Sequence, residues 1–378
     1  MGLRPLALSC FHTTWHYLMD CNQKGEHQMD MLAYVKAGRE PGLVLEHRPI
    51  PDQLLPGEAL IEILATSICG TDVHLYKWDA WSQKRVKPPF IAGHEFSGRV
   101  IKVAPDVTRV KVGDIVSAET HIVCGTCEFC QRGEYHVCEN TKIIGVDTDG
   151  CFAQYAKMPV SNLIVDHSGL DPKYLSIQEP LGNAVHTMLH FDLKDRSVAI
   201  VGAGPIGLMG VAIARAVGAK QVLAIEINEY RRNLAAKLGA DLVINPLKED
   251  VIQAVLQATN GRGIDVVCEF SGNKTAIEQA FKYVKAGGKM SMLGISPQTI
   301  EIDISNDVVF KGIHLYGVVG REMFRTWEQV ADLLKRKKLD LSAFITHFYR
   351  FDQMEEAMAT MMSGNSGKVV LVVKEDAK

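Results

Sequence analysis

The segment Ser197-Val-Ala-Ile-Val-Gly-Ala-Gly-Pro-Ile-Gly-Leu208 decides the fold. Its first five residues are an apolar run of the kind that forms a buried strand. Three glycines follow, and Pro205 suits the first turn of a helix that we expect to continue to Val217. The order of strand, glycine-rich turn and helix predicts the first unit of a parallel α/β sheet.

The pattern repeats beyond this unit. We expect strands at 221–226, 242–244, 265–270 and 289–293, with helices at 229–238, 250–259 and 275–284. Strands that alternate with helices form a parallel, doubly wound sheet. By contrast, residues 31 to about 180 read as short strands broken by proline and glycine, among them 59–64, 98–103 and 115–118.

The glycine pattern predicts a dinucleotide site. Gly202 permits the tight turn, Gly204 lets the backbone approach a pyrophosphate, and Gly207 lets helix and strand pack closely. Glu226 lies 19 residues beyond Gly207, where its carboxylate can accept hydrogen bonds from the ribose hydroxyls and repel a 2′-phosphate, so NAD is favoured over NADP. Alternatively, Glu226 is a solvated acid at a strand end. Arg231 either contacts the adenosine or is solvated.

Four cysteines, Cys124, Cys127, Cys130 and Cys138, lie within 15 residues. Thiolates at this spacing can surround Zn²⁺ as a closed tetrahedral structural site. The alternative is a surface loop with free thiols. A disulfide framework is disfavoured, because nothing in the sequence indicates secretion.

A second group of candidate ligands is spread along the chain. Cys69 precedes Gly-Thr-Asp, and His94 and Glu95 lie in Ala-Gly-His-Glu-Phe. Each is ordinary alone, since a cysteine is often a small buried hydrophobe. Together they offer a mixed S/N/O donor set with room for water or substrate, as a catalytic zinc requires. Glu179 either completes the set or relays a proton.

With these motifs in place, the chain resembles the zinc-dependent medium-chain alcohol dehydrogenases from about residue 31 to the C-terminus. The resemblance implies an α/β protein with a GroES-like, mainly-β catalytic domain and a Rossmann domain. It implies two Zn²⁺ per chain, one held by the four cysteines and one by Cys69, His94 and Glu95, with Glu179 bound directly or through water. Residues 182–186 contain no cysteine where alcohol-type members have a ligand. This departure favours the carboxylate-bearing polyol and amino-alcohol branch.

Four strings, at 74–83, 119–124, 180–187 and 320–327, resemble the L-threonine 3-dehydrogenase branch. The resemblance implies NAD-dependent oxidation of the threonine β-hydroxyl to 2-amino-3-oxobutanoate. Thr71 and His74 would relay the proton, His121 would line the substrate pocket, and Glu179 would influence proton transfer. The residues expected to contact the cofactor are Gly202, Gly204, Ile206, Gly207, Glu226, Arg231, Leu293, Gly294, Ile295, Val318 and Val319.

Several alternatives stay open. His74 could be a structural histidine, His121 a strand-end histidine, and Trp78 and Trp81 core aromatics rather than pocket walls. Arg321 is a candidate partner for the substrate carboxylate. The whole chain could instead be a polyol or 2,3-butanediol dehydrogenase, or a non-catalytic member that keeps the fold.

We expect residues 31–185 and 318–378 to form the catalytic domain, with a zinc lobe at 120–140, and 186–317 to form the NAD-binding domain. Residues 1–30 would be a disordered extension, or alternatively a His/Cys metal-binding tail. The net charge of −3 argues against nucleic acid and anionic membranes, and no apolar run approaches ~20 residues. The expected partner is a small amino alcohol, and the expected state a cytoplasmic homotetramer.

Overall fold

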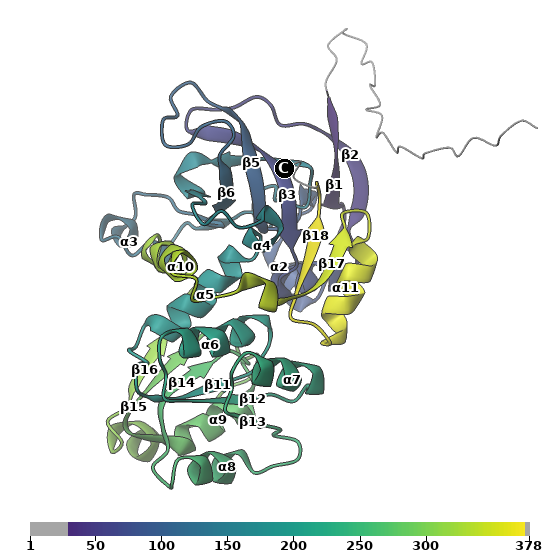
Figure 1. Cartoon of the computed structure of the whole chain (residues 1–378). Coiled ribbons are helices and arrows are strands. Elements are labelled where there is room, and N and C mark those ends of the chain that lie inside the picture. Colours follow the sequence, from purple (N-terminus) through teal and green to yellow (C-terminus); the bar gives the residue numbers. More distant parts are fainter. Residues whose placement is uncertain (1–28, 375–378) are drawn as a thin grey trace, which may run out of the picture.

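The computed structural model describes residues 29–374 in two parts, a β-rich part and a smaller α/β part (Figure 1). The predicted extension lies, apart from its last two residues, outside the described residues. Within residues 29–374, no helix combines the length and apolar character needed to cross a membrane.

The α/β part is built on a six-stranded sheet whose strands are all parallel, in the order β13-β12-β11-β14-β15-β16. In that order, the strands span Leu242–Ile244, Gln221–Ile225, Ser197–Val201, Ile264–Glu269, Val284–Met292 and His314–Gly317. Helices cover both faces: α6 (Pro205–Ala216), α7 (Glu229–Lys237), α8 (Val251–Ala258) and α9 (Lys274–Tyr283).

The alternation of side chains along β11 explains the two layers. Val198 and Ile200 pack with residues of α6 and α7, whereas Ala199 and Val201 pack with residues of α8 and α9. A strand with apolar side chains on both faces needs cover on both. The predicted doubly wound parallel sheet is confirmed.

The β-rich part contains a seven-stranded sheet in which β10, β6, β5, β3, β18 and β17 are neighbours in that order and β9 also pairs with β3. All its pairings are antiparallel except β17 with β18. Its strands span, in that order, Leu163–Val165, Ile115–Ala118, Glu95–Val103, Glu58–Ser67, Lys368–Val372, Ile345–Arg350 and Tyr155–Pro159.

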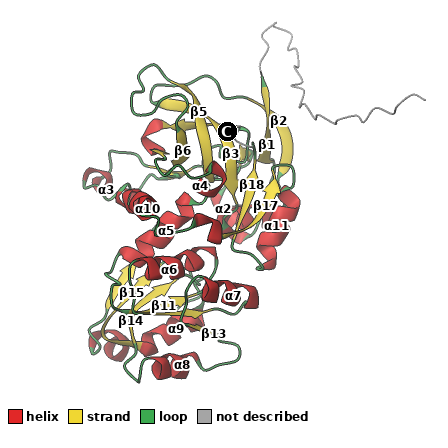
Figure 2. Cartoon of the chain, in the orientation of Figure 1, coloured by secondary structure: helices red, strands yellow, loops and turns green. Residues whose placement is uncertain are grey.

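Two smaller sheets and several short helices complete this part (Figure 2). The three-stranded sheet contains β2 (Val44–Pro49), β1 (Asp30–Lys36) and β4 (Phe90–Ile91), and the two-stranded sheet contains β7 (His121–Ile122) and β8 (Lys142–Ile143). The helices are α1 (Gly70–Lys77), α2 (Ala80–Arg85), α3 (Glu128–Gln131), α4 (Pro172–Leu175) and α11 (Met354–Ser363).

Strands β3 and β5 are longer than the sequence predicts. The expected bounds of 59–64 and 98–103 become Glu58–Ser67 and Glu95–Val103. The added ends carry polar residues that pair with one another: Ser67 lies opposite Glu95, and the Thr66 hydroxyl donates to the Glu95 carbonyl over 2.7 Å. The sheet therefore extends directly into the candidate site.

Helix α5 (Gln178–Leu189) joins the two parts. It packs against α6 of the α/β part and α10 (Arg325–Lys335), and it also contacts β5 and β6 (Figure 1). The chain then returns to the β-rich part, where β18 pairs with β3. Residues from both ends of the sequence thus meet around α5.

Substitution of Gly207 by alanine is expected to lower stability. A methyl group there would overlap the carbonyl oxygen of Gly202, which has a φ of +85° and has little freedom to move. Overpacking of this kind costs about 1–3 kcal/mol. Thermal unfolding should show a lower Tm for Gly207→Ala. Gly204→Ala is the matched control, since its methyl group would lie 4.0 Å from the nearest atom. An unchanged Tm for Gly207→Ala would contradict the packing argument.

Candidate active site and metal centres

The structure brings Cys69, His94 and Glu95 together. One sulfur, one nitrogen and one oxygen of these residues all lie within 4.8 Å of one another, with His94 and Glu95 buried. Cys69 is the N-cap of α1, and Glu95 begins β5. Their role as zinc ligands remains a prediction.

The surroundings of Glu95 fit a cation. One carboxylate oxygen, Oε2, accepts hydrogen bonds from Ser67 and from the buried ammonium of Lys368. The other, Oε1, is buried without a hydrogen-bond partner. A buried carboxylate oxygen without a partner is costly, and a bound metal ion would remove that cost.

Asp72 supports the other two candidate ligands. Its Oδ2 accepts the Cys69 backbone N–H over 2.8 Å, and its Oδ1 lies 3.6 Å from Nδ1 of His94. Burial raises the pKa of Asp72 to about 6, and His94 counteracts that effect. The separation from Nδ1 of His94 is longer than a hydrogen bond, and neither atom has another hydrogen-bond partner among the described residues.

The four cysteines of the predicted zinc lobe also converge. The Sγ atom of Cys124 lies 4.0 Å from that of Cys130 and 3.6 Å from that of Cys138. The Sγ atom of Cys127 lies 3.9 Å from that of Cys138. Zn–S bonds of ~2.3 Å place tetrahedral sulfurs ~3.8 Å apart. Hydrogen bonds from backbone N–H groups, first that of Thr126, lower the pKa of Cys124 to about 5, which favours the thiolate.

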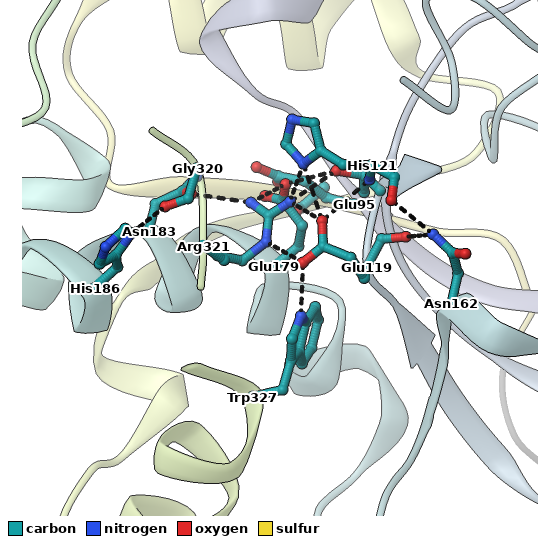
Figure 3. Close-up of polar contacts among 12 residues, drawn as sticks. Glu95, Glu119, His121, Asn162, Glu179, Asn183, His186, Gly320, Arg321 and Trp327 are labelled. Carbon is teal, nitrogen blue, oxygen red and sulfur yellow. Dashed lines mark hydrogen bonds and ion pairs between the residues drawn. The ribbon is translucent and has the colours of Figure 1, made fainter. Parts of the chain in front are cut away.

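A buried guanidinium dominates the interior of the site (Figure 3). Arg321 is 1% exposed, and its Nε donates to Glu119 over 2.8 Å, while Nη1 lies 2.6 Å from the carboxylate of Glu179. Although burial alone raises it, the pKa of Glu119 is held below its ordinary value by the charge and hydrogen bonds of Arg321. Trp327 also donates to Glu119, over 2.9 Å.

Two sequence expectations meet in this cluster. Glu179 forms an ion pair with Arg321 and accepts a hydrogen bond from Thr120, and it is not among the three residues whose potential ligand atoms converge around Cys69. The suggested contact of Arg321 with a substrate carboxylate is not favoured, because its donors already serve Glu119, Glu179 and Asn183. His121 lies at the edge of the cluster, with Nδ1 2.8 Å from Arg321 and its side chain 23% exposed.

The candidate relay residues lie on α1, directly after Cys69. Thr71 is in its first turn, and His74 is one turn further on, with its side chain 56% exposed. Nδ1 of His74 lies 2.5 Å from Asp79, so its other ring nitrogen is available to solvent. Of the two candidate pocket tryptophans, Trp78 is buried in the core and Trp81 is 41% exposed.

The candidate cofactor residues lie at the carboxyl edge of the parallel sheet. The glycine turn follows β11, Glu226 follows β12, residues 293–295 follow β15, and Val318 and Val319 follow β16. The carboxyl ends of the strands are where open α/β sheets bind ligands. Ile295 and Val319 are largely exposed there, at 92% and 52%.

Glu226 has a structural role in addition to the predicted one. Its two carboxylate oxygens accept the backbone N–H groups of Ala203 and Asn228, over 2.8 and 2.9 Å. Each oxygen retains a lone pair for a ribose hydroxyl. Arg231 is not freely solvated, because its Nε donates to the Ser366 carbonyl and burial lowers its pKa.

Sequence reasoning did not identify the roles of Glu119, Trp327, Lys368 and Asp72. Glu119 and Trp327 lie within the segments 119–124 and 320–327, which resemble the family, but this resemblance does not show which residues they contact. Lys368 opens an apolar strand and had no motif around it.

Comparisons with known proteins define the class. The family model described as "Zinc-binding dehydrogenase" matches residues 205–336, and "Alcohol dehydrogenase GroES-like domain" matches residues 55–167. The chain belongs to the zinc-dependent medium-chain alcohol dehydrogenases, and it is an oxidoreductase.

Within this family, the chain is 50% identical to the L-threonine 3-dehydrogenase of Pyrococcus furiosus over 345 residues, which cover 91% of this chain and 99% of that protein. Two solved structures are similar at lower identity. A zinc-binding dehydrogenase of Sinorhizobium meliloti bound to NADP has a TM-score of 0.84 at 28% identity, covering 92% of this chain and 100% of that one. The 2R,3R-butanediol dehydrogenase of Bacillus subtilis has a TM-score of 0.82 at 26%, covering 91% and 100%.

Removal of the buried guanidinium is expected to destabilise the protein strongly. Arg321→Leu would leave the buried carboxylates of Glu119 and Glu179 without their cation, a loss of about 3–5 kcal/mol. Arg325→Leu is the matched control, because its side chain is 70% exposed and pairs with Glu322 at the surface. Surface pairs contribute about 0–1 kcal/mol. Urea unfolding would measure both variants, and equal losses would contradict the role of the buried network.

Proposed function

We propose that this protein oxidises the β-hydroxyl of L-threonine to 2-amino-3-oxobutanoate, with NAD as hydride acceptor. The observation that carries the proposal is the convergence of Cys69 with the buried His94 and Glu95, with one carboxylate oxygen of Glu95 unsatisfied. The 50% identity over 99% of the Pyrococcus furiosus L-threonine 3-dehydrogenase supports this substrate over others of the family.

Zinc fits both donor sets. Four thiolates would hold one ion in a closed site, and Cys69, His94 and Glu95 would hold the other with a position left open. When bound there, zinc supplies a Lewis acid that lowers the pKa of a hydroxyl group by several units. Lys368 pairs with Glu95 and places a positive charge beside this buried carboxylate.

The proton of the substrate hydroxyl would leave along α1. Thr71 offers a hydroxyl one turn before His74, and the exposed imidazole of His74 can pass a proton to water. Asp79 orients that imidazole through Nδ1. His121 and Glu179 would line the opposite side, where both contact the guanidinium of Arg321.

The cofactor would lie along the carboxyl edge of the parallel sheet. The pyrophosphate would contact the N-terminus of α6 at Gly204, which no side chain caps. The carboxylate of Glu226 would accept the ribose hydroxyls and disfavour a 2′-phosphate. Leu293, Gly294 and Ile295, with Val318 and Val319, would contact the nicotinamide half.

A substrate panel tests the proposed function directly. Initial rates would be measured with L-threonine, sorbitol and 2,3-butanediol, each with NAD and with NADP. We expect the highest kcat/KM for L-threonine with NAD. A higher value with sorbitol or butanediol would favour the polyol branch, and a preference for NADP would refute the role given to Glu226.

We further propose the division into a catalytic domain of residues 31–185 and 318–378 and an NAD-binding domain of residues 186–317. The pairing of β18 with β3 supports the return of the chain to the first domain. A cytoplasmic homotetramer is also proposed, on the family resemblance alone. Light scattering coupled to size exclusion would measure the oligomeric state.

Replacement of His74 by asparagine is expected to affect turnover without affecting metal content. A positioned acid–base group contributes ~10²–10⁴-fold, so kcat should fall by that amount near neutral pH. The deficit should shrink at high pH, where hydroxide accepts the proton directly. The exposed His167 provides a control, and His167→Asn should keep the full kcat. Loss of zinc from His74→Asn would identify His74 as a ligand, and an unchanged kcat would remove it from the proton path.

A further inference from the structure

A third group of metal-ligating side chains lies outside the site described above. His186, His190 and Glu322 each offer one donor atom, and the three atoms lie within 4.8 Å of one another. The two histidines are four positions apart at the end of α5, where His190 is the C-cap and keeps helical geometry. Side chains at this spacing lie on the same face of a helix. The proposed oxidation uses none of the three.

His186 is arranged as a ligand would be. It is 3% exposed, and its Nδ1 lies 2.9 Å from the carbonyl oxygen of Gly320 (Figure 3). Because a carbonyl only accepts, Nδ1 carries the hydrogen and Nε2 keeps its lone pair. A backbone carbonyl that fixes the tautomer in this way is a common feature of metal-binding histidines. Nε2 points toward Glu322, with 3.8 Å to its Oε1.

His190 and Glu322 form the open side of the cluster. His190 is exposed and the side chain of Glu322 is 25% exposed, so an ion can enter from solvent. Burial lowers the pKa of both imidazoles, which favours the neutral form that binds metals. Glu322 bonds Arg325 through its other oxygen, Oε2, over 3.1 Å, so Oε1 remains directed at the histidines.

The distances suit a zinc-type ion after small movements. Bonds of ~2.0–2.2 Å to nitrogen and oxygen place tetrahedral donors ~3.4 Å apart. The 3.8 Å between His186 and Glu322 is close to this value. The remaining movement would be made by the side chains of His190 and Glu322, which are at least partly exposed and can rotate at little cost in free energy.

A simpler interpretation is a hydrogen-bonded cluster without metal. The Tyr316 hydroxyl lies 3.2 Å from Nε2 of His186 and can donate to it, and the ring of His190 stacks on Tyr316. This pairing accounts for the burial of His186. It does not account for the carboxylate oxygen of Glu322, which faces the imidazole from a separate segment of the chain.

We propose that His186, His190 and Glu322 form a third metal site, which takes a divalent transition ion of the zinc type. Nε2 of His186, one ring nitrogen of His190 and Oε1 of Glu322 are the ligands, and water fills the open position. The bound ion would join the end of α5 to the segment that carries Glu322. Arg321, at the centre of the buried network, is the adjacent residue, so occupancy would also fix the segment that positions it.

Cobalt(II) is a suitable probe, because its absorption reports the ligand type. The full-length protein, loaded with two zinc ions, would be titrated with Co²⁺, and bound cobalt counted after gel filtration. We expect one further ion per chain, with visible d–d bands but without thiolate-to-cobalt charge transfer. Charge-transfer bands would mean exchange at a cysteine site and would overturn the assignment.

Variants decide which residues bind. His190→Ala and Glu322→Gln should each weaken cobalt binding by at least ~10-fold, and thermal unfolding would check that both variants keep the fold. His314→Ala removes an exposed histidine on β16 and should leave binding unchanged. Tyr316→Phe should keep cobalt binding, since the hydroxyl is not a ligand. Failure to bind a third ion, or equal binding in His190→Ala and Glu322→Gln, would overturn the proposal.

Discussion

The structure depends on one buried ion-pair network, in which Arg321 meets the carboxylates of Glu119 and Glu179. The three residues come from the segment before β7, from α5 and from the segment before α10, so the network fixes elements that lie far apart in the sequence (Figure 3). A buried ion pair adds little stability relative to apolar residues in the same place, but loss of one partner lowers stability strongly. The network therefore specifies one arrangement of these elements more than it adds stability.

A second buried pair acts in the same way on the candidate metal site. Lys368, at the start of β18, bonds Glu95 at the start of β5, and its Nζ also donates to the Ile68 carbonyl over 2.8 Å. The C-terminal strand thus delivers a positive charge to a carboxylate 273 residues away. Because the ammonium of Lys368 contacts only Oε2 of Glu95, Oε1 is left for a metal ion. The return of the chain to the β-rich part therefore also brings Lys368 to the candidate metal site.

The sequence predicted what is local and missed what is distant. Strands at 115–118, 197–201 and 242–244 have the predicted bounds, because short apolar runs between turn residues define them. The four cysteines and the glycine turn were found because each motif lies within one short segment of the sequence. Helix α5 was not predicted, since Pro180 and Gly182 break the usual pattern; Pro180 is tolerated because it lies in the first turn. The partners of Arg321 lie up to 202 residues away, and no spacing rule reaches that far.

The two candidate zinc sites also differ in whether their ligands come from one segment or from distant segments. The cysteine lobe gathers four ligands from one short segment, and backbone N–H groups within that segment stabilise its thiolates. The candidate catalytic ligands come from the start of α1 and the start of β5, and they meet only because β3 and β5 extend to Ser67 and Glu95. A displacement of these strands would therefore dismantle the catalytic set while leaving the lobe intact. The catalytic site is therefore more sensitive than the cysteine lobe to a change in packing, because its ligands come from separate elements of the chain.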